Sequence, residues 1–419
     1  MSSTKAALIS VGFISLALVA NACGDDDSAA PGSSSGTTPG SSTSGNGGSS
    51  GNATSSGATS GGASSGTAPI TPPEKVQSGP PAGNPDGHAE VPAEGKAEDV
   101  SAPAKVIGTG TADSCKAADF VAAVKAGGVI TFNCGADPVT ITLTETAKVY
   151  NNVKKVVIDG GNKITLSGGG KIRILHQDSC DKTLGGYPQG PGDCNWTAGT
   201  TLVVQNITFV DGNTKGVSDK DNGAGGGAIW VHGGSTLKVI NARFFNNVCE
   251  DKGSDLGGAA IRKLDYWDGA STPPHMGPSR PAWVVNSTFG GADGYGNTCA
   301  NGGALSSIHT SWNIYNSVFS HNSAIGTGAN KGDGGNGGAI YNDGNEIVMQ
   351  VFGSYFHDNH ANEGGSAIFF VSNNSTGTIT VTDSKFEKNP KGQNGFQTGP
   401  GFYVKAKEPL KNVNSTILP

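Results

Sequence analysis

Basic clusters are missing from this 419-residue chain, and charge is sparse. Asp, Glu, Lys and Arg make up 15% of the residues, aromatic residues 7%, and the formal net charge is −6. No Lys/Arg cluster exceeds two or three residues. Because nucleic-acid-binding surfaces concentrate Lys and Arg on one face, this composition argues against a nucleic acid as partner.

Helical patterns are missing after residue 130. Before it, Ser114 can cap a helix over 115–126, which Gly127-Gly128 would end. Short β segments follow, each bounded by Gly, Asn or Asp: 129–132, 139–143, 153–158, 164–167 and 172–175. The absence of alternating helices excludes βαβ architectures.

An apolar run opens the chain. Lys5 precedes the run at 6–20, and Ala20-Asn21-Ala22-Cys23 follows, so residues 1–22 are interpreted as a signal peptide. A Cys directly after Ala-Asn-Ala resembles the bacterial lipobox, which implies cleavage before Cys23 and diacylation of its thiol. We therefore expect an exported protein that is lipid-anchored in the bacterial envelope, at the outer membrane or cell surface. An ordinary signal peptide with a chance Cys is the alternative.

Residues 23–104 lack apolar periodicity. Gly, Ser, Thr and Ala dominate as far as about Thr67, and Pro-rich stretches follow. Such a segment has no core to offset the entropy cost of ordering it. We predict a disordered, lipid-anchored tether over 23–104 and a folded domain over 105–419.

An internal repeat occupies about 202–390. Its first half is a Gly-Gly pair followed by small and aliphatic residues, as in Gly226-Gly227-Ala228-Ile229, and its second half is centred on a Phe. Asn is frequent three residues before that Phe, as at Asn206 and Asn241, and three after it, as at Asn322 and Asn359. The Phe positions are Phe209, Phe244, Phe289, Phe319, Phe356 and Phe386. A period of about 30–45 residues is typical of solenoids, propellers and arrays.

The repeat predicts an all-β solenoid of single-chain coils, a parallel β-helix. Residues before each Phe alternate between apolar and polar, which indicates half-buried strands. Stacked coils would align the Phe column, an Asn turn ladder and an aliphatic ladder. The aliphatic ladder is Ile229, Ile261, Leu305, Ile340 and Ile368. The helix at 115–126 would be a short N-terminal cap over an open strand edge. A propeller is the competing all-β fold.

A family resemblance follows from these motifs. Gly-Gly-Ala-Ile paired with Phe-x-x-Asn, as in Phe319-Ser320-His321-Asn322, resembles the repeats of polymorphic outer-membrane proteins. More broadly the chain resembles the right-handed parallel β-helix, pectate-lyase-like superfamily. That resemblance implies a right-handed coil and a function among adhesins or polysaccharide-cleaving enzymes.

Six Cys remain when Cys23 is set aside, an even number that implies disulfides in an exported protein. Cys180 and Cys194 bracket one Gly/Pro-rich loop, and Cys115 and Cys134 flank the predicted helix. Cys249 and Cys299 lie in equivalent turns of adjacent repeats. These three pairings are the prediction. The alternative is a metal site, but the sequence lacks the close Cys or His spacing that such a site needs.

The residue after each aliphatic ladder position would face outward. That column is Trp230, Arg262, Ser306, Tyr341 and Phe369. Exposed aromatics with an Arg suit stacking against sugar rings or a partner protein, so we expect a binding surface here, with Tyr266 and Trp267 contributing from a neighbouring insertion. The alternative is that loops fold over this face and bury it.

The insertion at 263–280 offers a second hypothesis, a polysaccharide lyase that eliminates across a uronate. Arg262 or Lys263 would act as base, Arg280 would neutralise the carboxylate, and Asp265 with Asp268 would hold a cation. Trp-Ile-Asp-His and Arg-x-Pro-x-x-Arg, the pectate-lyase signatures, are absent. Clustered Asp residues on adjacent strands, which a polygalacturonase-type hydrolase needs, are not evident either.

The leading functional hypothesis is therefore a lipid-anchored β-helix protein that binds glycans or surface partners without catalysis. The alternative is the lyase on the same scaffold, and a third is a structural envelope protein. No cofactor is expected, except Ca²⁺ if the lyase hypothesis holds. The membrane, through the lipid anchor, and a polysaccharide or surface protein are the expected partners.

Overall fold

The computed structural model describes residues 78–185, 199–217, 223–265, 281–393 and 397–419. The predicted signal peptide, Cys23 and residues 24–77 of the predicted tether lie outside these ranges. Within them, no helix has both the length and the apolar character needed to span a membrane.

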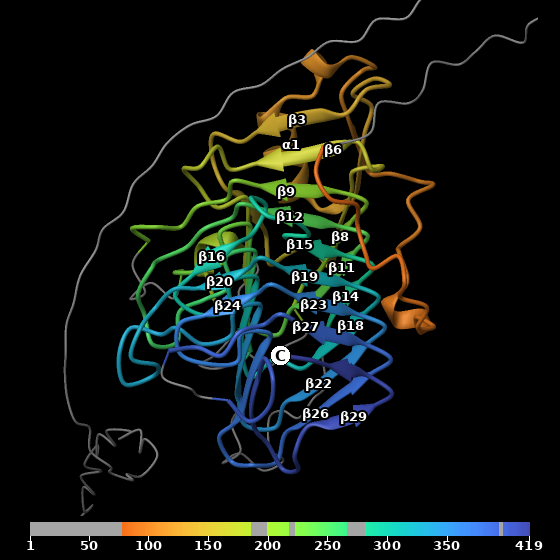
Figure 1. The fold of residues 1–419 in the computed structure, drawn as a ribbon. Helices are drawn as coiled ribbons and strands as arrows, with labels where there is room; N and C mark the ends of the chain where they lie inside the picture. The colour runs from red at the N-terminus through yellow and green to blue at the C-terminus, as the bar shows by residue number, and fades with distance from the viewer. Residues whose placement is uncertain (1–77, 186–198, 218–222, 266–280, 394–396) are drawn as a thin grey trace, which may run out of the picture. The chain divides into compact units, whose positions relative to one another are not determined.

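The described chain coils into a parallel β-helix, which confirms the all-β solenoid prediction. Successive coils stack their strands into three long sheets, named A, B and C, and a short sheet D, and Figure 1 shows sheets A and B as adjacent stacks. Every strand pair within these sheets is parallel, as in β11–β14, β12–β15 and β10–β13. The sheets therefore enclose one continuous apolar core.

The strand bounds are as follows. Sheet A is β1 (Lys105–Ile107), β2 (Gly128–Phe132), β5 (Lys155–Asp159), β8 (Thr201–Gln205), β11 (Thr236–Ile240), β14 (Ala282–Val285), β18 (Trp312–Tyr315), β22 (Val348–Phe352), β26 (Thr378–Thr382) and β29 (Lys411–Val413). Sheet B is β3 (Val139–Thr142), β6 (Ile164–Ser167), β9 (Thr208–Val210), β12 (Arg243–Phe245), β15 (Thr288–Phe289), β19 (Val318–Ser320), β23 (Tyr355–His357), β27 (Lys385–Glu387) and β30 (Thr416–Ile417). Sheet C is β4 (Ala147–Val149), β7 (Leu175–Asp178), β10 (Ile229–His232), β13 (Ile261–Leu264), β17 (Leu305–Ile308), β21 (Ile340–Gly344), β25 (Ile368–Ser372) and β28 (Phe402–Lys405). Sheet D is β16 (Thr298–Cys299), β20 (Ser323–Ala324) and β24 (His360–Ala361).

The Phe column of the repeat forms a continuous stack inside the coil. All six rings are fully buried. Consecutive ring centroids lie between 4.6 and 5.0 Å apart, from Phe209–Phe244 to Phe356–Phe386. The aliphatic ladder from Ile229 to Ile368 is in register on sheet C and is also fully buried. Stacking of identical positions thus explains why both columns recur.

Helix α1 (Ala117–Ala126) begins two residues later than predicted. Ser114 does not cap it, because Ser114 ends the 3-10 turn η2 (Ala112–Ser114) and its Oγ accepts from the Thr109 amide. Phe120 and Val124 are fully buried in the core, and α1 contacts β4, the edge strand of sheet C.

Residues 78–104, which the sequence assigned to the tether, pack along the outside of the coils. Asn84 and Ala89 hydrogen-bond to Asn316, at 2.8 and 2.9 Å. Glu98 pairs with Lys155 at 2.7 Å and with Lys238 at 2.8 Å, and these two Lys pull the pKa of Glu98 below its usual value against the cost of burial. The predicted tether boundary at 104 is therefore wrong, because polar contacts and apolar packing of Ala89, Val91 and Val100 on sheet A order this segment.

Candidate functional site: the outer face of sheet C

The predicted outward column lies on one face of sheet C. Parallel pairing places Trp230 beside Arg262, Arg262 beside Ser306, Ser306 beside Tyr341 and Tyr341 beside Phe369. The same column extends to His176 on one side and to Tyr403 on the other. The alternation that predicted this column is confirmed.

The predicted exposure of this column is not confirmed, because the column is covered. Trp230 and Tyr341 are 0% exposed, and Arg262 and Phe369 are 6% exposed. Two loops lie over them: a Cβ added to Gly225 would come within 2.7 Å of Arg262 Cδ, and Asp255 contacts the Tyr341 hydroxyl. The prediction of an exposed binding row at Trp230, Arg262, Tyr341 and Phe369 is therefore wrong.

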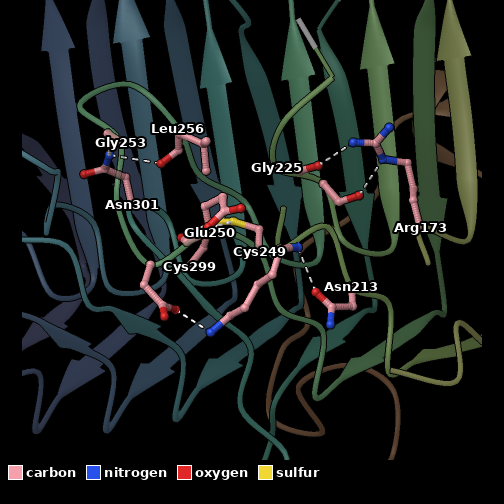
Figure 2. The surroundings of a disulfide bond; sticks show 12 residues. Arg173, Asn213, Gly225, Cys249, Glu250, Gly253, Leu256, Cys299 and Asn301 are labelled. Atoms are coloured by element: carbon pink, nitrogen blue, oxygen red, sulfur yellow. Dashed lines mark hydrogen bonds and ion pairs between the residues drawn. A yellow bond between two sulfur atoms is a disulfide. The ribbon is translucent and has the colours of Figure 1, made fainter. Parts of the chain in front are cut away.

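A disulfide and a small apolar cluster hold this cover together. Cys249 and Cys299 are bonded, and they pack with Ala224, Leu256 and Ala300 in a cluster separate from the main core. Figure 2 shows this disulfide with the loop residues around it, including Gly225, Gly253 and Leu256. The Cys115–Cys134 pairing is confirmed as well. Cys180 is disulfide-bonded, whereas its predicted partner Cys194 lies outside the described residues.

Arg173 anchors the loop over the first half of the column. Its guanidinium donates to the carbonyls of Gly225 and Gly226, at 2.9 and 3.1 Å, and lies 5.7 Å from the Trp230 ring. His176 stacks on Trp230 with centroids 4.7 Å apart. Burial, followed by the charge of Arg173, lowers the pKa of His176 to about 4, so His176 is neutral at physiological pH.

Asp178 and His232 extend this polar cluster, with His232 Nδ1 and Asp178 Oδ1 2.9 Å apart. The possible ligand atoms of Asp178, Cys180 and His232 all lie within 4.8 Å of one another. Because the sulfur of Cys180 is in a disulfide, it offers no thiolate to a metal. Asp178 and His232 thus act as a hydrogen-bonded pair at the sheet surface.

Of the predicted lyase residues, Arg262, Lys263 and Asp265 lie in the described part of the chain. Lys263 faces the interior, in register with Val231 and Ser307, and is 0% exposed. Its Nζ lies 2.5 Å from both carboxylate oxygens of Asp265, which also accepts from Thr310 at 2.9 Å. Lys263 is therefore unavailable as a base, and Asp265 is committed to an ion pair. Arg280, Asp268, Tyr266 and Trp267 lie outside the described residues.

Sequence reasoning missed a carboxylate cluster at the other end of the column. The Tyr341 hydroxyl lies 3.0 Å from Asp255 Oδ1 and 3.2 Å from Asp343 Oδ2. Asp343 Oδ1 accepts from Asn373 at 2.7 Å. Burial, followed by the nearby charge of Asp255, raises the pKa of Asp343 to about 6. Strand alternation could have placed Asp343 beside Tyr341, but Asp255 comes from a loop 86 residues away in sequence.

The aromatic column becomes accessible at its last member. Tyr341 stacks on Phe369 at 5.2 Å, and Phe369 stacks on Tyr403 at 4.8 Å. Tyr403 is half-buried, and Lys405, two residues further along the same strand face, is also half-buried. An aromatic ring and a cation therefore lie two residues apart on β28, the edge strand of sheet C.

A scan against protein-family models found no matching family, and searches of curated proteins and of solved structures found no match to the chain.

Proposed function

We propose that the protein is exported, is anchored through a lipid on Cys23, and uses its β-helix domain to bind a polysaccharide without cleaving it. The ligand would lie at the accessible end of the aromatic column on sheet C, over Tyr403. The observation that carries this proposal is the stacked series Tyr341–Phe369–Tyr403, whose last ring is the accessible one. Disulfide-linked loops also suit a protein that works outside the cytoplasm.

The surroundings of Tyr403 favour a sugar over a surface protein. Sugars pair an apolar ring face with many hydroxyls, so a site for them combines an aromatic ring with a few polar groups. Tyr403 supplies the ring, and Lys405 supplies a polar group two residues further along the same strand face. The partly exposed apolar residues of this cluster are Tyr403 and Ile308, a smaller surface than the broad patch that a protein partner would cover.

Replacing Tyr403 by Ala tests the proposal. Tyr403 is only half-buried and lies on the edge strand of sheet C, where it stacks on Phe369, so its loss should leave the β-helix folded. On a glycan array, and by titration with the best-bound glycan, we expect at least about a tenfold loss of affinity for Tyr403→Ala. Tyr403→Phe, which keeps the stack, should bind within about threefold of the unchanged protein.

Tyr355, which lies on the outer side of sheet B, provides the matched control, and Tyr355→Ala should not alter binding. If Tyr403→Ala binds every glycan as the unchanged protein does, the site is not at Tyr403. If no glycan is bound at all, a purely structural envelope role becomes the better conclusion.

Two described residues count against the lyase alternative, because Lys263 is interior and Asp265 is ion-paired. We expect no unsaturated product when the full-length mature chain is incubated with acidic polysaccharides, with or without Ca²⁺. Product formation that disappears in Arg262→Ala would reverse this conclusion.

A further inference from the structure

Too many oxygen acceptors surround the Tyr341 hydroxyl for the hydrogens available. The hydroxyl has one proton, yet Asp255 Oδ1 and Asp343 Oδ2 lie 3.0 and 3.2 Å from its oxygen, and the Asn330 amide lies against it with Nδ2 at 3.3 Å and Oδ1 at 3.5 Å. One proton can serve one of these acceptors. The two carboxylate oxygens thus share one hydroxyl group that has a single hydrogen to donate.

An independent feature lies against the same cluster. Asn336 is 0% exposed, and its amide nitrogen donates to Asn330 Oδ1 at 3.4 Å, so its amide group reaches the cluster. The carbonyl oxygen of that amide is buried and has no hydrogen-bond donor among the described residues. Leaving such an oxygen without a partner is unfavourable, and a positively charged ligand would supply one.

We propose that these residues form a binding site for Ca²⁺. Its ligands are the carboxylates of Asp255 and Asp343 and the amide oxygens of Asn330 and Asn336, with the Tyr341 oxygen at its edge and water completing the shell. Two carboxylates with neutral oxygens form a ligand set that suits a hard cation. These ligands are carboxylate, amide and phenol oxygens, whereas zinc prefers His nitrogen and Cys sulfur. Ca²⁺ fits better than Mg²⁺ because amide carbonyls and irregular geometry suit the larger ion.

The site would join three separate segments. Asp255 lies in the loop that covers sheet C, Asn330 and Asn336 lie in the loop before β21, and Asp343 lies in β21 itself. Asp255 and Asn330 are exposed, so their side chains can move toward an ion without disturbing the core. Bound Ca²⁺ would therefore fasten the cover of sheet C to the coil beneath it.

Terbium luminescence tests the proposal on the EDTA-treated, full-length mature chain. Tb³⁺ emits when a nearby tyrosine is excited, and Tyr341 would lie at the edge of the site. We expect saturable Tb³⁺ emission that Ca²⁺ competes away, and a rise in melting temperature on adding Ca²⁺. Asp343→Asn and Asp255→Asn should each weaken Ca²⁺ binding at least about tenfold.

Two further variants keep the result decisive. Asp333→Asn is the matched control, since Asp333 is an acidic residue of the same loop, pairs with Lys252 and should leave Ca²⁺ binding unchanged. Tyr341→Phe should lose most of the emission yet retain the Ca²⁺-dependent rise in melting temperature. Should Asp343→Asn fail to fold, the exposed Asp255→Asn gives the answer alone. Ca²⁺ binding that is absent, or equal in Asp255→Asn and the unchanged protein, overturns the proposal. No sugar is present, so the result is independent of the proposed glycan binding.

Discussion

Asparagine has two separate roles in each coil. Three residues before the Phe, Asn206, Asn241 and Asn316 adopt left-handed backbone with φ between 48 and 52°, and Gly353 takes the same position with φ 55°. Three residues after it, buried Asn side chains bond from coil to coil, as when Asn322 Nδ2 donates to Asn359 Oδ1 at 3.0 Å. The sequence predicted both Asn columns, because Asn suits left-handed turns and ladders. It missed Asn297, which belongs to the ladder but follows a longer turn.

Removing one ladder member should destabilise the domain strongly. Asn322→Ala deprives Asn297 of an acceptor and Asn359 of a donor, all of them 0% exposed. We expect a loss of about 2–4 kcal/mol in the free energy of unfolding by urea denaturation. Asn313→Ala, on the outer side of β18, should change it by less than about 0.5 kcal/mol. Equal effects of the two changes would contradict the ladder's role.

The buried His176 predicts a pH dependence. Its pKa is lowered from 6.5 to about 4, so the unfolded chain binds a proton that the folded chain does not between these values. Stability should therefore be greatest above pH 6.5 and fall by about 3 kcal/mol as the pH drops to 4. Denaturation midpoints measured across this range should decline less in His176→Gln, whose amide can still accept from Arg173. An identical decline in both proteins would assign the effect to other groups.

At the scale of the element, the alternation along a strand determines which way each side chain points but not what surrounds it. On β13, Ile261 and Lys263 face the core and Arg262 faces outward, as period two requires. Direction was therefore predictable for Trp230, Tyr341 and Phe369. Their burial was not, because it depends on loops whose apolar residues, such as Leu256, carry no strand or helix period. Likewise, no sequence pattern predicted that the Lys263 side chain would lie inside the coil.

The interior ion pair can be tested by breaking it from one side. Among the described residues, Lys263→Met leaves the half-buried Asp265 carboxylate with Thr310 as its side-chain hydrogen-bond partner. Because removing one partner leaves an uncompensated charge, we expect a loss of about 3 kcal/mol in unfolding free energy. The double change Lys263→Met with Asp265→Asn should recover part of it. Lys252→Met, at an exposed Lys that pairs with Asp333, should have little effect. A Lys263→Met protein of unchanged stability would show that the pair is not needed.

At the scale of the whole molecule, the fold class, the core columns and two disulfides followed from the sequence. The fold class and the core columns depend on residue types that recur at one position of successive coils, so many stacked copies predict the same contact. The disulfides followed from Cys pairs that flank one predicted helix or lie in equivalent turns. The carboxylate cluster did not follow. Asp255 and Asp343 meet through a loop and a strand that share no motif, and residues 78–104 pack on the coils although their composition resembles a tether.

The Cys249–Cys299 bond ties two turns that are 50 residues apart in sequence. Closing a loop of that length should contribute about 4 kcal/mol, so Cys249→Ser with Cys299→Ser should lower the urea midpoint markedly. It should also loosen the cover of sheet C. Quenching of tryptophan fluorescence by acrylamide should therefore rise, since Trp230 lies beneath that cover. Unchanged quenching would show that packing alone holds the loops.

The path of residues 78–104 governs how the domain would respond to a pull on the chain that precedes it. Residue 78 lies beside Arg243 in β12, midway along the stack rather than at its first coil. Before tension reached α1 it would have to break the contacts of Asn84 with Asn316, of Ala89 with Asn316, and of Glu98 with Lys238. These bonds cross several coils and would be loaded together in shear. The segment thus protects the first coils from being peeled off one at a time.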